Sequence, residues 1–211
     1  MIRIALTKGR IEEKAVELLE KCGYDISELR NKGRKLIFRL TGSDIEVVLA
    51  KAADVLTYIE HGVCDVGVVG EDTILEYEKP LYEMMDLGFG KCRFALAGLK
   101  GGDFYAGYSH KKIATKYPNV AKKYFNSKGI DIEIVKIEGS VELAPILELA
   151  DAIVDIVETG STLKENGLEV YEDIIPVSAR LVVNTASMKL KKGEIETLIS
   201  KLSDVIKSEN K

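Results

Sequence analysis

The segment Asp151-Ala-Ile-Val-Asp-Ile-Val-Glu-Thr-Gly-Ser-Thr-Leu163 carries the pattern that decides the fold. Its apolar stretch, residues 152–157, predicts a buried strand. Gly160 predicts a tight turn, and residues 161–166 predict a short helix that Gly167 ends. A strand that passes through a glycine turn into a helix is the repeating joint of α/β folds, so we predict that class.

The same segment has the makings of a phosphate cradle. The N–H groups of a first helical turn have no partner in the helix and favour an anion. Thr159, Ser161 and Thr162 add hydroxyl donors, whereas Asp155 and Glu158 suit sugar hydroxyls or a divalent cation that accompanies pyrophosphate. On pattern alone, a plain structural turn between a core strand and a capped helix fits equally well.

A similar joint stands at the start of the chain. Residues 2–6 predict a strand, residues 11–22 predict a helix, and Thr7-Lys8-Gly9-Arg10 connects them. Lys8 and Arg10 therefore lie where a strand passes into a helix, at the edge of an open α/β sheet where ligands bind. Two solvated surface charges are the alternative interpretation.

A basic segment follows. Residues 35–40 and 45–50 predict two strands of a hairpin around Thr41-Gly-Ser-Asp44. The cations of this region are Arg30, Lys32, Arg34, Lys35 and Arg39. Such a cluster is usually a solvated face, but it could also contact a triphosphate.

Strands and helices alternate along the chain, which predicts mainly parallel sheets. Return strands are expected at 170–177 and 181–185. Residues 88–93, with two glycines and two cations, are the best candidate for a crossing between lobes. We therefore expect lobe I to hold residues 1–90 and 177–211, lobe II to hold 91–176, and glycine-rich loops to line a cleft between them.

Composition narrows the class of protein. The chain has 211 residues, which suffice for one large domain or two small ones, and its net charge of −4 argues against a general nucleic-acid binder. It has no apolar run of membrane-spanning length and no signal-peptide layout at its start. Cys22, Cys64 and Cys92 form no CxxC pair, which favours free thiols in the cytoplasm over a metal site.

Five blocks in one order resemble the short form of the ATP phosphoribosyltransferase family. They spread over nearly the whole chain, so together they are far more specific than any one block. They are 4–11 (Ile4-Ala-Leu-Thr-Lys-Gly-Arg-Ile11), 54–62, 65–70 (Asp65-Val-Gly-Val-Val-Gly70), 87–94 and the pair 139–145 with 151–168.

The resemblance implies a two-lobed fold like that of type II periplasmic binding proteins, with the active site in the cleft between the lobes. It implies transfer of the 5-phosphoribosyl group from phosphoribosyl diphosphate to N1 of ATP, which releases pyrophosphate in the first step of histidine biosynthesis. Mg²⁺ would be carried by the diphosphate, without a site made of protein groups alone. The implied partners are a second catalytic chain in a homodimer and a regulatory subunit that resembles a histidyl-tRNA synthetase, since no C-terminal regulatory domain is expected.

The resemblance also assigns residues. Lys8, Arg10 and Lys51 would be the catalytic cations, and Arg34, Lys8 and Glu142 would bind ATP. Phosphoribosyl diphosphate would be bound by Asp155, Glu158, Thr159, Gly160, Ser161 and Thr162. No nucleophilic side chain is needed, because adenine N1 attacks the sugar. Many relatives carry arginine in place of Lys51, and lysine keeps the charge but loses the bidentate fork.

Three other classes of protein fit less well. A solute-binding protein of the same fold would need an export signal. Purine and pyrimidine phosphoribosyltransferases use adjacent acids before the Thr-Gly loop, whereas two residues separate Asp155 from Glu158. A Walker-type hydrolase would need GxxxxGK[ST], which the sequence lacks.

Overall fold

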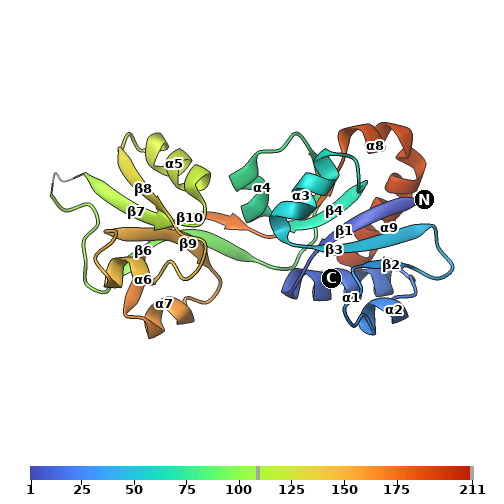
Figure 1. Ribbon diagram of the computed structural model, residues 1–211, viewed down its shortest axis with the longest axis horizontal. Coiled ribbons are helices and arrows are strands. Elements are labelled where there is room, and N and C mark those ends of the chain that lie inside the picture. Colours follow the sequence, from blue (N-terminus) through green and yellow to red (C-terminus); the bar gives the residue numbers. More distant parts are fainter. Residues whose placement is uncertain (108–109, 210–211) are drawn as a thin grey trace. The chain divides into compact units, whose positions relative to one another are not determined.

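The computed structural model describes residues 1–107 and 110–209, and the chain folds as two compact units (Figure 1). Unit 1 consists of Met1–Gly90 and the chain from Ser178 onward, and unit 2 is Lys91–Val177. Four residues of the predicted lobes, 108–109 and 210–211, lie outside the described part.

Unit 1 is built on a sheet with the strand order β2-β3-β1-β4-β11-β5. β1 is parallel to both β3 and β4, and the other three pairings are antiparallel. Its strands are β1 (Ile2–Thr7), β2 (Ile37–Arg39), β3 (Ile45–Ala50), β4 (Val66–Gly70), β5 (Tyr82–Asp86) and β11 (Ala179–Val183). The hairpin predicted over 35–50 is confirmed, because β2 pairs antiparallel with β3.

Helices cover both faces of this sheet. Alternate β1 residues point to opposite faces, so Ile4 and Leu6 pack with α1 and α9 while Ala5 packs with α3. The helices are α1 (Arg10–Lys21), α2 (Ser27–Arg30), α3 (Ala52–Glu60), α4 (Glu71–Tyr77), α8 (Thr185–Leu190) and α9 (Lys192–Glu209). Among all the helices in the described part, none combines the length and apolar character that crossing a bilayer takes.

Unit 2 has its own sheet, with the order β10-β6-β9-β7-β8. β7 is parallel to β8 and β9, whereas β6 is antiparallel to β9 and β10. Its elements are β6 (Cys92–Leu99), β7 (Lys111–Thr115), α5 (Pro118–Ser127), β8 (Ile132–Lys136), α6 (Leu143–Ile146), β9 (Ala152–Val157), α7 (Ser161–Glu165) and β10 (Leu168–Val177).

The prediction of α/β structure is confirmed, but the prediction of mainly parallel sheets is wrong. Of the nine strand pairings that the described residues form, four are parallel and five antiparallel. The reason is that β11 inserts antiparallel between β4 and β5, and β10 pairs antiparallel along β6.

The predicted strand at 181–185 also ends early. Asn184 caps α8 by accepting hydrogen bonds from the N–H groups of Ala186 and Ser187, so Thr185 is already helical. Neither α8 nor α2 is predicted from the sequence.

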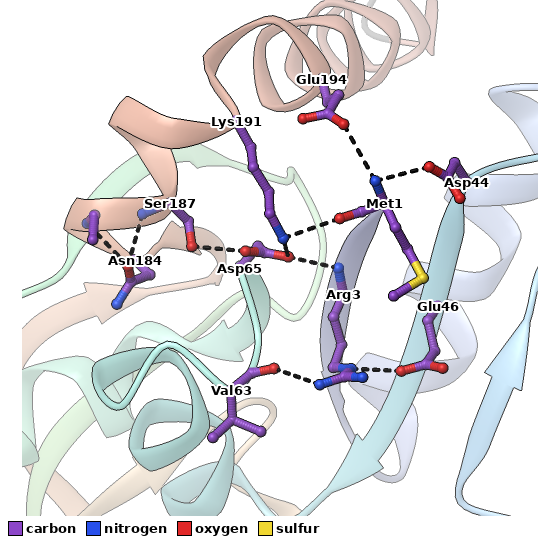
Figure 2. A network of polar contacts seen from close by, with 11 residues as sticks. Met1, Arg3, Asp44, Glu46, Val63, Asp65, Asn184, Ser187, Lys191 and Glu194 are labelled. Carbon is purple, nitrogen blue, oxygen red and sulfur yellow. Dashed lines mark hydrogen bonds and ion pairs between the residues drawn. The ribbon is translucent and has the colours of Figure 1, made fainter.

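The buried carboxylate of Asp65 connects β1 to α8 and to Lys191, the residue after α8 (Figure 2). Asp65, 4% exposed, accepts hydrogen bonds from the Arg3 N–H at 2.9 Å, the Ser187 hydroxyl at 2.7 Å and the Lys191 amine at 2.9 Å. Burial opposes ionisation, but the hydrogen bonds from Lys191, Arg3 and Ser187 outweigh it and hold the pKa of Asp65 below its usual range. The side chain is therefore ionised in the folded protein at neutral pH.

The first prediction concerns this carboxylate. Asp65→Asn should lower the free energy of unfolding by about 2–3 kcal/mol at pH 7, because Lys191 loses its charged partner. Since folding lowers the pKa of Asp65, the carboxylate stabilises the protein above its unfolded-state pKa, and this gain is lost as the pH falls through the folded-state value. Urea unfolding at several pH values should thus show a constant difference from wild type above about pH 5 that shrinks below about pH 4. A difference that grew on acidification would contradict this account.

The second prediction concerns Glu148, which follows α6 with a φ of 57°. A residue with a Cβ atom is strained in this left-handed region, so Glu148→Gly should raise the free energy of unfolding by about 0.5–1 kcal/mol. Gly167→Ala is the matched control, because Gly167 has a φ of 74° and alanine should destabilise the protein there. Denaturant midpoints of the two variants should move in opposite directions, and a lower midpoint for Glu148→Gly would refute the prediction.

Candidate functional site

The loop after β9 has the local structure that the sequence predicts. The strand over 152–157 is confirmed, and the helix predicted over 161–166 is α7, which ends at Glu165. Gly160 lies between them with a φ of 79°, in the left-handed region, and its carbonyl accepts the Lys164 N–H at 3.1 Å. The turn therefore depends on glycine at this position.

Hydroxyl groups gather on this loop. The Thr159 and Ser161 side-chain oxygens are 3.0 Å apart, and the Thr159 hydroxyl accepts the Ser161 N–H at 3.3 Å. Thr162 is also exposed. Because α7 has only five residues, its dipole is small, so the loop amides and hydroxyls must supply most of any attraction for an anion.

The two acidic candidates lie beside the loop. Asp155, on β9, shares a face of the strand with Ile153 and Val157, since side chains alternate along a strand. Ile153 and Val157 pack in the core that also contains Leu163 of α7, so Asp155 lies on the α7 side of the sheet and is half-buried. Glu158 is the first residue after β9 and is exposed.

Arg93 braces the same loop, a role that is not predicted from the sequence. Its guanidinium donates to the Glu158 carbonyl at 3.3 Å and to the Asp173 carboxylate at 2.5 Å. The antiparallel register brings this about, because it places Arg93 opposite Val157 at the end of β9. A single sequence gives no signal for that register.

Glu142 stands at the same edge of the unit 2 sheet. β7 lies between β8 and β9, parallel to both, and Thr115 at its end pairs with Lys136 and Val154. The connections that follow β8 and β9 therefore leave from one edge. Glu142 ends the first of these connections, and the Gly160 loop is the second.

Three candidate cations share an edge of unit 1. Thr7 pairs with Ala50 in the parallel register of β1 and β3, and the Lys8 N–H donates to the Ala50 carbonyl at 2.9 Å. Lys8 and Lys51 are thus the first residues beyond two neighbouring strands, and both are exposed. Arg10 follows at the first position of α1.

The basic segment is largely neutralised by acidic partners. Four of its five cations form ion pairs: Arg30 with Glu20 at 2.6 Å, Lys32 with Glu12 at 2.5 Å, Lys35 with Glu28 at 2.8 Å and Arg39 with Asp44 at 3.5 Å. Arg34 is exposed and has no such partner among residues 1–107 and 110–209. Within this segment, Arg34 is therefore the cation best placed to meet an anionic ligand.

Comparison with protein families gives one match that covers most of the chain. Residues 51–204 match the family model described as HisG: ATP phosphoribosyltransferase. An ATP phosphoribosyltransferase of Clostridium kluyveri is 68% identical over 201 residues, which cover 95% of this chain and 92% of the relative. The enzyme of Clostridium acetobutylicum is 59% identical over 209 residues, with 99% and 97% covered.

Solved structures show a related fold. A chain from the ATP phosphoribosyl transferase (HisG:HisZ) complex of Thermotoga maritima has 40% identity and a TM-score of 0.84, with 99% of this chain and all of that chain covered. The periplasmic aliphatic sulphonate binding protein SsuA of Escherichia coli has a TM-score of 0.60 at 13% identity, with 97% of this chain and 72% of that chain covered. The likeness to SsuA shows the fold alone and confirms the predicted fold of periplasmic binding proteins.

The family model and these relatives carry the name of the family that the five sequence blocks resemble. The chain therefore belongs to the ATP phosphoribosyltransferase family.

Proposed function

We propose that the chain performs its family's reaction with the residues described above. The enzyme transfers the 5-phosphoribosyl group of phosphoribosyl diphosphate to N1 of ATP and releases pyrophosphate, in the first step of histidine biosynthesis. The observation that carries the residue assignment is the loop after β9, where Gly160 in the left-handed region brings hydroxyl and amide donors together.

This loop would hold the 5′-phosphate of the donor. The hydroxyls of Thr159, Ser161 and Thr162 and the amides of the turn are neutral donors that suit phosphate oxygens. Asp155 and Glu158 would accept hydrogen bonds from the ribose hydroxyls, because a carboxylate accepts such bonds and repels phosphate. By bracing the Glu158 carbonyl, Arg93 would keep this part of the loop in place.

The cations of unit 1 would act on the leaving group. When the bond from the sugar to pyrophosphate breaks, positive charge develops on the ribose and negative charge on the pyrophosphate. Lys8, Arg10 and Lys51 would stabilise that negative charge, and each charged hydrogen bond contributes roughly 1.5–3 kcal/mol. Lys51 would act as a point charge, because an amine cannot make a bidentate fork.

Arg34, Lys8 and Glu142 would bind ATP. Arg34 and Lys8 are free to meet the triphosphate, since neither has a carboxylate partner in the described part of the chain. Adenine N1 is the nucleophile, so positioning of the two substrates, rather than a reactive side chain, is what the protein supplies.

Mg²⁺ would enter with the diphosphate. It is a hard cation that prefers oxygen ligands and is usually held by substrate phosphates together with one or two carboxylates. Asp155 and Glu158 are the carboxylates of this site with the appropriate chemistry. When bound, the ion would offset part of the charge of the leaving group.

We also propose a hetero-oligomer. The similar chain from Thermotoga maritima belongs to a HisG:HisZ complex, which supports a regulatory partner for this chain. The expected partners are a second catalytic chain and a subunit that resembles a histidyl-tRNA synthetase. The three cysteines, Cys22, Cys64 and Cys92, are free thiols, in keeping with a cytoplasmic location.

The third prediction tests the reaction. The purified chain, mixed with ATP, phosphoribosyl diphosphate and Mg²⁺, should form phosphoribosyl-ATP, measured by mass and by absorbance, alone or after addition of the regulatory subunit. Lys51→Ala should lower the turnover number roughly tenfold to hundredfold, because the protein loses one positive charge that would stabilise the departing pyrophosphate. Lys189→Ala on α8 is the control and should have wild-type turnover. Absence of product with and without the partner would overturn the proposed function.

The fourth prediction tests the cradle. Gly160→Val should weaken binding of phosphoribosyl diphosphate at least about tenfold, because a β-branched residue is strained in the left-handed region and the loop must change shape. The fold should survive, since the closest atom to an added Cβ is the Val157 side chain at 3.7 Å, an ordinary contact. Gly101→Val is the matched control in unit 2, with a φ of 76° at a glycine far from this loop in the sequence. Calorimetric titration that gave equal affinities for the two variants would refute the assignment.

A further inference from the structure

Arg34 is presented by a closed turn. The Lys35 N–H donates to the Lys32 carbonyl at 3.0 Å, so residues 32–35 form a hydrogen-bonded β-turn. Gly33, with a φ of 53°, is its first central residue and Arg34 its second. Of these two central residues, only Gly33 has a positive φ, which is the pattern of a type II′ turn.

Both ends of this turn are held by glutamates. The Lys32 amine is 2.5 Å from a carboxylate oxygen of Glu12, and the Lys35 amine is 2.8 Å from one of Glu28. The two pairs differ in burial, because the Glu12 side chain is 6% exposed and that of Glu28 is 50% exposed. An exposed pair such as Lys35–Glu28 contributes little to holding the turn. Breaking the Lys32–Glu12 pair would leave a buried carboxylate without its cation, which is costly, so this pair is the stronger anchor of the turn.

The buried glutamate belongs to the joint that carries two proposed site residues. Glu12 lies in the first turn of α1, which starts at Arg10 and follows Lys8. The ion pair with Lys32 therefore joins the turn of Arg34 to the strand–helix joint of Lys8 and Arg10. This connection spans 20 residues of sequence.

We infer that Glu12 is a positioning residue for ATP binding, which acts through Lys32 to hold Arg34 in place. The inference rests on the proposed assignment of Arg34 to ATP. Glu12 itself would not bind a phosphate, because its carboxylate repels anions and is paired with Lys32. By anchoring the turn in the free protein, Glu12 lowers the conformational entropy that Arg34 loses when ATP binds.

The fifth prediction is a double-mutant cycle on the full chain. Arg34→Ala should weaken ATP binding roughly tenfold to hundredfold, as expected for loss of a charged hydrogen bond. Glu12→Gln should weaken it about threefold to tenfold, because the turn is no longer anchored. In the Arg34→Ala background, Glu12→Gln should have no further effect, since Glu12 acts only through Arg34. Calorimetric titration with ATP gives the four dissociation constants.

Two further variants serve as controls. Glu20→Gln removes the other α1 carboxylate that pairs with the basic segment, at 2.6 Å from Arg30, and should leave ATP affinity unchanged. Lys32→Gln breaks the same ion pair from its more exposed partner, which is 43% exposed, and should also weaken ATP binding about threefold to tenfold. It takes the place of Glu12→Gln if that variant does not fold. Thermal unfolding of each variant verifies that the titrated protein is folded.

The outcomes separate the two assignments. If Arg34→Ala weakens ATP binding and neither Glu12→Gln nor Lys32→Gln does, the positioning role is refuted while the assignment of Arg34 stands. Additive effects of Glu12→Gln and Arg34→Ala would also refute it, because they would show a general structural role. If Arg34→Ala binds ATP normally, the assignment of Arg34 fails, and the inference built on it fails as well.

Discussion

The parallel pairing of β1 with β3 is the interaction on which the candidate chemistry of unit 1 depends. Parallel strands end at the same edge of a sheet, and the register that pairs Thr7 with Ala50 makes Lys8 and Lys51 neighbours beyond that edge. A shift of one residue would turn the side chains of β3 to the wrong faces and bury polar groups in the core. The two apolar cores around β1 therefore fix the position of these cations.

Local patterns in the sequence predict much of the fold, because short-range physics determines them. The strand, left-handed glycine and helix of residues 152–165 are all specified by neighbours in sequence, and so is the hairpin of β2 and β3. The direction of β11 could not be predicted in this way. A strand of five residues, four of them apolar, has the same pattern in parallel and antiparallel pairing, and the partners β4 and β5 are distant in sequence. The capping residue Asn184 did offer a signal for α8.

The candidate site likewise has parts that the local sequence predicts and parts that it does not. The sequence identifies the loop around Gly160 and the five cations of the basic segment, but it does not tell which cation is available to a ligand. That depends on where the acids of α1 lie, since Glu12 and Glu20 neutralise Lys32 and Arg30. The brace of Arg93 on Glu158 depends likewise on a strand register. Long-range pairing, which a single sequence does not reveal, decides both.

The placement of β11 has a consequence for the order in which the chain can fold during synthesis. β11 lies between β4 and β5, and β5 has no other strand partner in the described part of the protein. All of unit 2 is synthesised before β11, so unit 2 can form its sheet while unit 1 still lacks an inner strand. Until β11 arrives, the open edge of β4 is an unpaired strand that other chains could join. The loop around Gly160 can therefore form within a complete unit 2 before the sheet next to Lys8 and Lys51 is complete.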